Sequence, residues 1–369
     1  MRLRLLFLLL LFSVGLAIPS PGQDKKADDD VIKVDTRLVD VPLAVTSPSG
    51  IPLKGLKATN FIVYEDGKKQ DIVDFSATTA PFEVALVLDT SGSARNDLPL
   101  IQRAARDFIA GLRPGDRVAV IAFNTDRKNN TAFAASEVLT MLTDDRAKLK
   151  SAIDNVKTSN GTPYYDSLLQ VAEKIFSQRP ADEFRGRRAL VALTDGVDSS
   201  SSVDFKTVKE ELGQVGVISF FIQVDTQEYF EETLLGDCQS AIRFSSAQIR
   251  RYYQTINSKG KRMEKAVNFC QLGDFERLAI SERLYDIAEE EMMDLAKGSG
   301  GKVFPVGDFS EARNAFKSVA DEIGTKYTLG YYPSNEKKDG TVRKIKVEVK
   351  GLPAGTVVRA REGYVAPSN

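Results

Sequence analysis

The chain has 369 residues, enough for two domains of ordinary size, and its 42% hydrophobic and 27% charged residues are typical of a globular protein. Its formal net charge is −1 and it shows no basic footprint, so nucleic acid is not an expected partner. It contains no histidine, which argues against zinc sites and against catalysis by histidine.

The N-terminus has the features of a secretory signal. Arg2 and Arg4 precede the apolar stretch Leu5–Ala17, which is too short to span a bilayer comfortably. We predict a signal peptide at 1–17, followed by a Pro-, Lys- and Asp-rich linker at 18–30. The mature protein is then exported, to the periplasm or the extracellular space, without stable membrane insertion. A retained membrane anchor is the alternative.

Residues 31–80 have the pattern of β-strands. Apolar residues alternate with other residues from Val39 to Val45, as expected for a strand. Further on, the segments Phe61–Tyr64 and Ile72–Phe75 flank the turn residues Asp66 and Gly67, a pattern that predicts a β-hairpin.

The centre of the chain alternates strands and helices, which predicts a doubly wound, mostly parallel (Rossmann-like) α/β sheet over residues 81–324. The predicted strands are 84–89, 117–123, 189–194, 217–224 and 302–306. The predicted helices are 98–112, 146–156, 164–177, 203–212, 284–297 and 310–323. In such sheets ligands bind at the carboxyl ends of the strands, near the point where the strand order reverses.

A carboxylate and two hydroxyls follow the first of these strands. The apolar run Val84–Leu88 leads directly into Asp89, and Ser91 and Ser93 follow at steps of two residues. A carboxylate at the end of a buried strand can emerge at the edge of the sheet, where it does not need a buried partner. One carboxylate and two hydroxyls form a hard oxygen site, which is the chemistry that Mg²⁺ prefers.

Two further groups of the same kind lie downstream. Thr162 stands in the loop between two predicted helices, and Asp195 ends the second buried strand, Leu190–Thr194. Both Asp89 and Asp195 therefore stand at carboxyl ends of predicted strands, where the fold class places a ligand. Capping of neighbouring helices is the purely structural role open to the two aspartates.

Residues 226–281 are an insertion, because they separate a predicted strand from the next helix by far more than a usual loop. The insertion leaves the carboxyl end of its strand, and so begins on the same edge as Asp89 and Asp195. It holds both cysteines of the chain, Cys238 and Cys270. In an exported protein we predict that they form a disulfide, and two separate buried thiols are the alternative.

The C-terminal residues 325–367 contain three more predicted strands, at 327–332, 342–349 and 357–365. Neither end of the chain is large enough to bury a good core by itself. We therefore predict that 31–80 and 325–367 together form one β-sandwich, into which the α/β domain is inserted.

The order of the site residues resembles the von Willebrand factor type A (VWA) domain family. Its metal-ion-dependent adhesion site (MIDAS) has the pattern Asp-x-Ser-x-Ser, then Thr, then Asp. The matching residues in this chain are Asp89, Ser91, Ser93, Thr162 and Asp195. The flanking segments Phe61–Gly67 and Tyr327–Pro333 resemble a bacterial group of exported VWA-related proteins first grouped from acidobacteria.

The resemblance implies a binding function. In the family, residues matching Ser91 and Ser93 bind Mg²⁺ (or Mn²⁺ or Ca²⁺) directly, the one matching Thr162 binds directly or through water, and the aspartates act largely through water. An Asp or Glu carboxylate of a protein or peptide partner completes the coordination. We therefore predict a metal-dependent binding or adhesion module that is not an enzyme. The alternatives are a structural module with a stabilising metal and a metal-assisted phosphoesterase.

Overall fold

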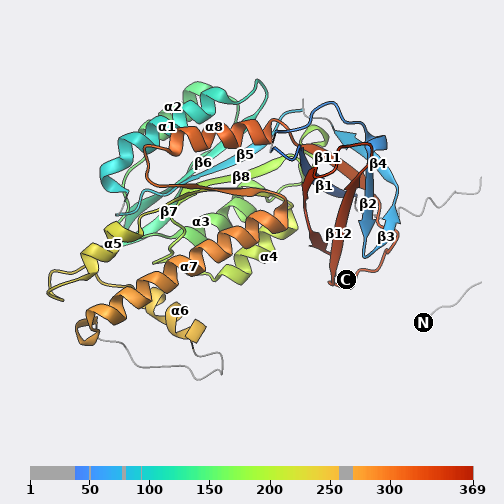
Figure 1. Ribbon diagram of the computed structural model, residues 1–369. Coiled ribbons are helices and arrows are strands. Elements are labelled where there is room, and N and C mark those ends of the chain that lie inside the picture. Colours follow the sequence, from blue (N-terminus) through green and yellow to red (C-terminus); the bar gives the residue numbers. More distant parts are fainter. Residues whose placement is uncertain (1–37, 50, 77–79, 93, 257–268, 369) are drawn as a thin grey trace, which may run out of the picture. The chain divides into compact units, whose positions relative to one another are not determined.

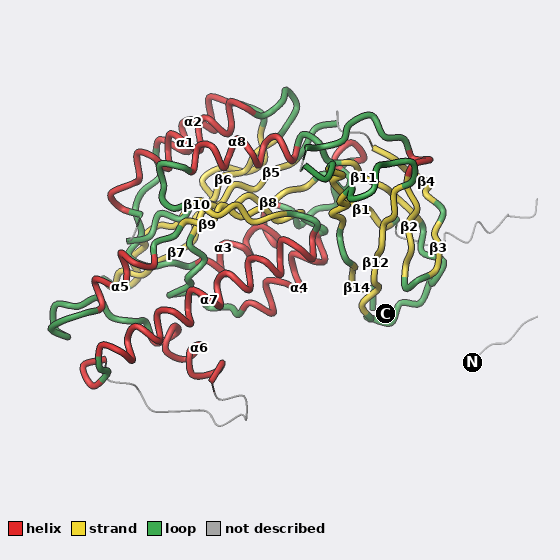
Figure 2. The backbone as a smooth tube through the Cα atoms, viewed as in Figure 1, coloured by secondary structure: helices red, strands yellow, loops and turns green. Residues whose placement is uncertain are grey.

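A six-stranded sheet with the order β10-β9-β8-β5-β6-β7 lies at the centre of the fold (Figure 2). Its strands are β5 (Glu83–Leu88), β6 (Arg117–Lys128), β7 (Thr131–Thr143), β8 (Arg188–Thr194), β9 (Ile218–Val224) and β10 (Lys302–Val306). All neighbours pair in parallel except β7, which is antiparallel to β6. Strands β5 and β8 are buried throughout, as expected for strands covered on both faces.

The computed structural model describes residues 38–49, 51–76, 80–92, 94–256 and 269–368, all within one compact unit, Thr36–Asn369. The predicted signal peptide, the linker and Ser93 lie outside the described residues. Among the described helices, none is both long and apolar enough to cross a membrane.

Helices cover both faces of the sheet (Figure 1). One face carries α1 (Leu98–Gly111), α2 (Arg146–Asp154) and α8 (Ala312–Ile323), and the other carries α3 (Tyr164–Gln170), α4 (Phe205–Val215) and α7 (Asp274–Ser299). Helix α1 shows why: its apolar residues Ile101, Ala104, Ala105 and Phe108 recur at helical spacing and are buried against the sheet. The predicted α/β fold is therefore confirmed.

Strand β7 was not predicted from the sequence. It forms a hairpin with the extended end of β6 through Asn129 and Asn130, both at positive φ (49° and 64°), the backbone that a two-residue hairpin turn requires. As an edge strand, β7 has no fully buried residue, so its sequence lacks the strict alternation of a half-buried strand.

Eight strands from the two ends of the chain form two four-stranded sheets, β13-β1-β11-β4 and β14-β12-β2-β3. Their bounds are β1 (Val39–Thr46), β2 (Phe61–Glu65), β3 (Lys68–Gln70), β4 (Ile72–Ser76), β11 (Tyr327–Tyr331), β12 (Val342–Val349), β13 (Val357–Ala360) and β14 (Gly363–Val365). Each sheet combines strands from both ends, and their apolar side chains share one buried cluster. We call these two sheets the flanking sheets.

Two strand predictions were wrong in detail. The turn at Asp66 and Gly67 joins β2 to the short strand β3, while the predicted hairpin partner, Ile72–Phe75, lies in β4 and pairs with β11 in the other sheet. Asp66 and Gly67 both have positive φ (47° and 81°), which fixes a two-residue turn and hence pairing of the residues next to it. The predicted strand 357–365 is split into β13 and β14, one in each flanking sheet.

A buried carboxylate links the flanking sheets. The Glu65 side chain, 2% exposed, accepts hydrogen bonds from the hydroxyls of Tyr331 (2.7 Å) and Tyr364 (2.9 Å). Glu65 and Tyr331 belong to the two flanking motifs that were noted in the sequence. A buried carboxylate needs hydrogen-bond donors, and here two strands from the far end of the chain supply them.

One buried arginine, Arg187, is hydrogen-bonded to both segments that connect the flanking sheets to the α/β domain. Arg187 is 0% exposed and donates to the carbonyl oxygens of Ala80 (2.7 Å) and Pro81 (3.1 Å) on the way in. It also donates to the carbonyl oxygen of Lys326 (3.5 Å) on the way out. Its guanidinium stacks on the Phe82 ring at 4.3 Å, which helps to keep the charge buried.

The insertion contains α5 (Gln227–Leu234), α6 (Ser246–Ile256) and the first turns of α7. Its residues Leu234, Phe244, Phe269 and Ile280 belong to a small apolar cluster that also includes Val197, Leu284 and Ala288. The structure joins Cys238 and Cys270 in a disulfide, as predicted. The cluster and the disulfide connect the described parts of the insertion to one another.

We expect Tyr331→Phe to lower the free energy of unfolding by about 1–3 kcal/mol, because the buried Glu65 carboxylate loses one of its hydroxyl donors. The matched control is Tyr332→Phe, since Tyr332 is 52% exposed and should change stability by less than about 0.5 kcal/mol. Urea unfolding measures both variants. Equal stability of Tyr331→Phe and the wild type would contradict the proposed role of this hydrogen bond.

Candidate metal and ligand site

The candidate site lies where two neighbouring parallel strands end. Strands β5 and β8 pair in register, with Leu88 opposite Leu193, and the Asp89 amide donates to the carbonyl oxygen of Leu193 at 2.9 Å. From β5 the sheet continues to β6 on one side, while later strands are added beyond β8 on the other. The strand order therefore reverses between β5 and β8, which is the position where open α/β sheets bind ligands.

Asp89 is 2% exposed and its two carboxylate oxygens are held separately. Oδ1 accepts from the Ser91 amide at 3.0 Å, and Oδ2 accepts from the Thr194 hydroxyl at 2.7 Å. The Ser91 side chain also hydrogen-bonds to this carboxylate. Thr194 belongs to β8, so the neighbouring strand fixes the orientation of Asp89.

Asp195 is 9% exposed and is fixed from the other side of the site. Its Oδ1 accepts from the Val197 amide at 2.9 Å, and its Oδ2 accepts from the Thr226 hydroxyl at 2.7 Å. The Thr226 and Tyr285 hydroxyl oxygens are 2.9 Å apart. If Thr226 donates its single proton to Asp195, then Tyr285 donates to Thr226, so α7 orients Asp195 through a two-step relay.

The tight turn after Asp195 requires a glycine. Gly196 has φ 78°, a left-handed conformation that side chains disfavour, and a Cβ there would meet the end of Met292 on α7 at 2.9 Å. The glycine at this position therefore allows α7 to pack closely against the turn.

Thr162 reaches the same edge of the sheet from the loop before α3. The Ser159 amide donates to the Thr90 carbonyl oxygen at 2.7 Å, which attaches this loop to the segment after β5. Thr162 and Ser199 exchange hydrogen bonds, from the Thr162 amide to Ser199 Oγ (2.8 Å) and from the Ser199 amide to the Thr162 carbonyl (3.0 Å). Asp89, Ser91, Thr162 and Asp195 therefore share one edge, while Ser93 lies outside the described residues.

The two aspartates are an uncompensated pair of buried acids. Burial raises the pKa of Asp89, and hydrogen bonds from Ser91 and Thr194 oppose that effect. Burial, followed by the charge of Asp89, raises the pKa of Asp195 to about 7. Within the described part of the chain, neither carboxylate forms a salt bridge with lysine or arginine. A cation bound between them would supply the missing charge.

The donor set fits a hard divalent cation. It offers two carboxylates and the Ser91 and Thr162 hydroxyls, and such oxygen donors suit Mg²⁺, Mn²⁺ or Ca²⁺. No group of three or more His, Cys, Asp or Glu side chains suited to a metal occurs in the described ranges. The oxygen donors here are instead two acids and hydroxyls.

Several residues of the site were not found from the sequence. Thr194 stands next to Asp195, and Thr226 follows the end of β9, so the strand-end rule that selected Asp195 would also have selected both. Tyr285 had no such local signal. Tyr164, which follows Thr162 closely, has a buried hydroxyl without a hydrogen-bond partner among the described residues, and burial raises its pKa well above the usual value.

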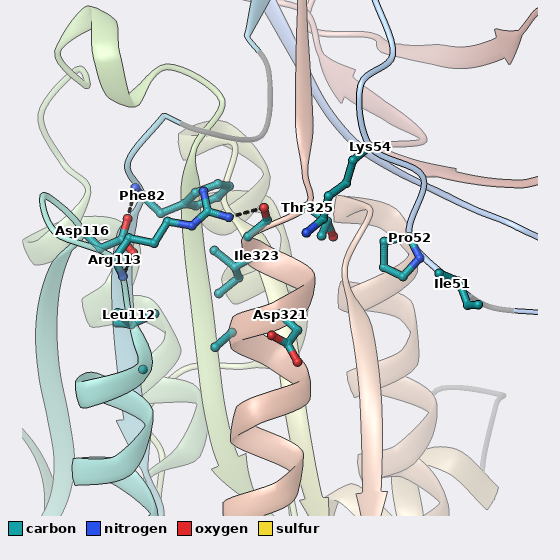
Figure 3. Close-up of a pocket in the computed structure, with 13 residues that line it drawn as sticks. Ile51, Pro52, Lys54, Phe82, Leu112, Arg113, Asp116, Asp321, Ile323 and Thr325 are labelled. Atoms are coloured by element: carbon teal, nitrogen blue, oxygen red, sulfur yellow. Dashed lines mark hydrogen bonds between the residues drawn. The ribbon is translucent and has the colours of Figure 1, made fainter.

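A pocket of about 390 Å³ lies at the opposite ends of the strands, where Phe82 precedes β5 and Asp116 precedes β6 (Figure 3). Two of its charged side chains form hydrogen bonds within the lining of the pocket. Asp116 accepts from the amides of Phe82 (2.7 Å) and Arg113 (2.8 Å), and the Arg113 guanidinium donates to the Gly324 carbonyl oxygen. This pocket is therefore separate from the candidate site, and the side chains of Arg113 and Asp116 already have partners.

Comparisons with known proteins agree with this geometry in one region. Residues 84–198 match the sequence profile of the von Willebrand factor type A domain. Platelet adherence protein A of Streptococcus gordonii is 21% identical over 235 residues, which cover 53% of this chain and 6% of that protein. The chain thus spans a small part of the length of this relative.

Two solved structures illustrate the similarity. Proximal thread matrix protein 1 from the mussel byssus, with a zinc-occupied MIDAS motif, is 16% identical, with a TM-score of 0.42 over 70% of this chain and 49% of that chain. A von Willebrand factor type A protein from Catenulispora acidiphila is 12% identical, with a TM-score of 0.43 over 91% of this chain and 75% of that chain.

In the presence of a chelator, we expect the protein to become less stable as pH rises from 5 to 8. The pKa of Asp195 is raised to about 7 in the folded state, whereas the pKa of an aspartate in the unfolded chain is about 3.9. The contribution of Asp195 to stability is therefore complete below the unfolded pKa and is lost as the pH rises through the folded pKa. Thermal melting of the wild type and Asp195→Asn measures the difference. If both melting temperatures changed identically with pH, Asp195 would not be the titrating group.

Proposed function

We propose that the VWA domain of this chain, which includes residues 84–198, binds a divalent cation at the carboxyl-end edge of its sheet and, through it, a carboxylate of a protein partner. The observation that carries the proposal is the buried pair Asp89 and Asp195, which lacks a cationic side chain among the described residues and borders two hydroxyls. A buried acid pair without compensation is costly, and a bound cation removes that cost.

The ligand set that we propose is Asp89, Ser91, Ser93, Thr162 and Asp195. The hydrogen bonds to both oxygens of each aspartate orient these carboxylates and leave their remaining lone pairs for the ion or its water. Neutral hydroxyls then supply the direct contacts, as the family resemblance implies. An ion held by few charged ligands stays electrophilic and accepts a carboxylate from a partner. Mg²⁺, Mn²⁺ and Ca²⁺ all fit this chemistry.

A protein partner is the partner class that the comparisons support. VWA domains are interaction modules, and the similar Streptococcus gordonii protein is named for platelet adherence. We propose a protein or peptide that presents an Asp or Glu carboxylate. Metal-assisted hydrolases commonly use more carboxylates or a second metal. A further buried carboxylate, Asp198, already pairs with Arg251, so a hydrolase is not favoured.

We also propose that the flanking sheets form one β-sandwich, with the α/β domain inserted near residues 81–324. The support is the shared apolar cluster and the hydrogen bond that the Tyr331 hydroxyl donates to Glu65, which joins the two ends of the chain. Export remains part of the proposal on the sequence features of residues 1–17, and the disulfide between Cys238 and Cys270 suits an oxidising compartment.

The central test is metal binding by Asp89→Asn. Calorimetry of the purified mature chain should show one Mg²⁺ or Mn²⁺ site in the wild type, and an affinity at least about 100-fold lower in the variant, because one of two charged ligands is lost. Asn keeps the size of the side chain, so the melting temperature in chelator should be no lower than that of the wild type. Unchanged Mg²⁺ binding by the variant would refute the site. If the metal were only structural, Asp89→Asn would lose stability but would still capture a partner.

A second test concerns the relay to Asp195. Thr226→Val removes the hydroxyl that orients Asp195, and losses of such supporting bonds typically weaken metal binding about 10- to 100-fold. Thr226→Ser keeps the hydroxyl and should bind Mg²⁺ as the wild type does. The two variants together separate the hydrogen bond from the fold. Equal affinities of the Val and Ser variants would remove Thr226 from the site.

A further inference from the structure

The insertion places an arginine beside the candidate site. Arg251 lies on α6 (Ser246–Ile256), and its Nη2 is 3.7 Å from Asp198 Oδ1, while its Nη1 donates to the Asp198 carbonyl oxygen at 3.5 Å. The guanidinium lies over the Tyr165 ring, 4.5 Å from its centroid. Ile249 and Tyr252, on either side of Arg251 in the sequence, pack against the apolar cluster of the insertion and so fix the position of α6.

Asp198 is a third buried carboxylate at this edge of the sheet. It is 1% exposed, stands three positions after Asp195, and its charge contributes to the raised pKa of Asp89. Its oxygens accept from the amides of Tyr165 (3.3 Å) and Ser201 (3.2 Å), so it also holds the start of α3, the helix that follows Thr162. Arg251 is the cation that pairs with it among the described residues.

Arg251 also faces a fourth carboxylate. The Tyr165 hydroxyl donates to Glu291 on α7, and the charge of Arg251 lowers the pKa of Glu291 against the larger effect of burial. The arginine therefore acts electrostatically on two acids that belong to the surroundings of the site and not to the proposed ligand set.

We propose that Arg251 is a specificity-determining residue of the metal site: it neutralises Asp198, so that the bound cation keeps enough positive charge to accept a carboxylate ligand. This inference rests on the proposed function. Extra negative charge near an ion strengthens binding of the cation and weakens binding of an anion to that cation. The insertion, through Arg251, then adjusts the balance between holding the metal and capturing the partner.

The proposal predicts opposite changes in two affinities. In Arg251→Met, which keeps the length of the side chain and removes its charge, we expect Mn²⁺ to bind about three- to tenfold more tightly. Acetate should bind to the Mn²⁺-loaded variant more weakly by a similar factor. Calorimetry measures Mn²⁺ alone, and the relaxation of water protons by bound Mn²⁺ measures displacement of water by acetate. Both are recorded at one pH, which is the same for every variant.

Three variants serve as controls. Arg250→Met removes a charge from the exposed neighbouring position and should change neither affinity. Arg251→Lys keeps the charge and should restore both affinities toward the wild-type values. Asp198→Asn combined with Arg251→Met removes the excess charge and should also return both affinities toward wild type.

The outcomes separate this inference from the proposed function. If the wild type does not bind Mn²⁺, the proposed function itself is refuted, and the role of Arg251 is refuted with it. If the wild type binds Mn²⁺ but Arg251→Met weakens both Mn²⁺ and acetate, then Arg251 only supports the structure and the inference is overturned. Unchanged affinities in Arg251→Met would overturn it as well.

Discussion

The site depends on one constraint, which is that two carboxylates are buried at the ends of adjacent parallel strands. Asp89 and Asp195 are carried together because β5 and β8 pair in register up to the residues before them. Buried charges require hydrogen bonds and an opposite charge. The hydrogen bonds come from Ser91, Thr194, Val197 and Thr226, whereas the opposite charge is not supplied by a side chain among the described residues. That imbalance is the physical basis for the cation site that we propose at this edge.

The insertion and α7 are built into the site and are not a separate attachment. Tyr285 on α7 reaches Asp195 through Thr226, and Arg251 on α6 reaches Asp198 and Tyr165. The apolar cluster, which contains Val197 and contacts Ile249 and Tyr285, and the disulfide between Cys238 and Cys270 hold these side chains in place. Without such internal order, the entropy of positioning a long arginine side chain would oppose its ion pair.

The flanking sheets are attached to the α/β domain by buried polar contacts. Arg187 donates hydrogen bonds to the carbonyl oxygens of Ala80, Pro81 and Lys326, where the chain enters and leaves the domain. Lys326 is itself buried, with Nζ 3.5 Å from Glu322 Oε1, and burial lowers its pKa to about 8. Buried charges tolerate little displacement, because any movement leaves them without partners. These contacts therefore favour one fixed relation between the flanking sheets and the domain.

The sequence by itself determined the features that are local in the chain. Apolar runs ending in Asp89 and Asp195 identified two buried strands and their carboxyl ends, and the compartment argument identified the bond between Cys238 and Cys270. The tertiary structure alone decided which residues orient the acids. Thr226 and Tyr285 are 59 positions apart, and Arg251 is 53 positions from Asp198. Local periodicity records which face of an element is buried, but a hydrogen bond between distant hydroxyls leaves no period in the sequence. The same reason explains the division of 357–365 between two sheets: strand pairing depends on neighbours that are remote in the chain.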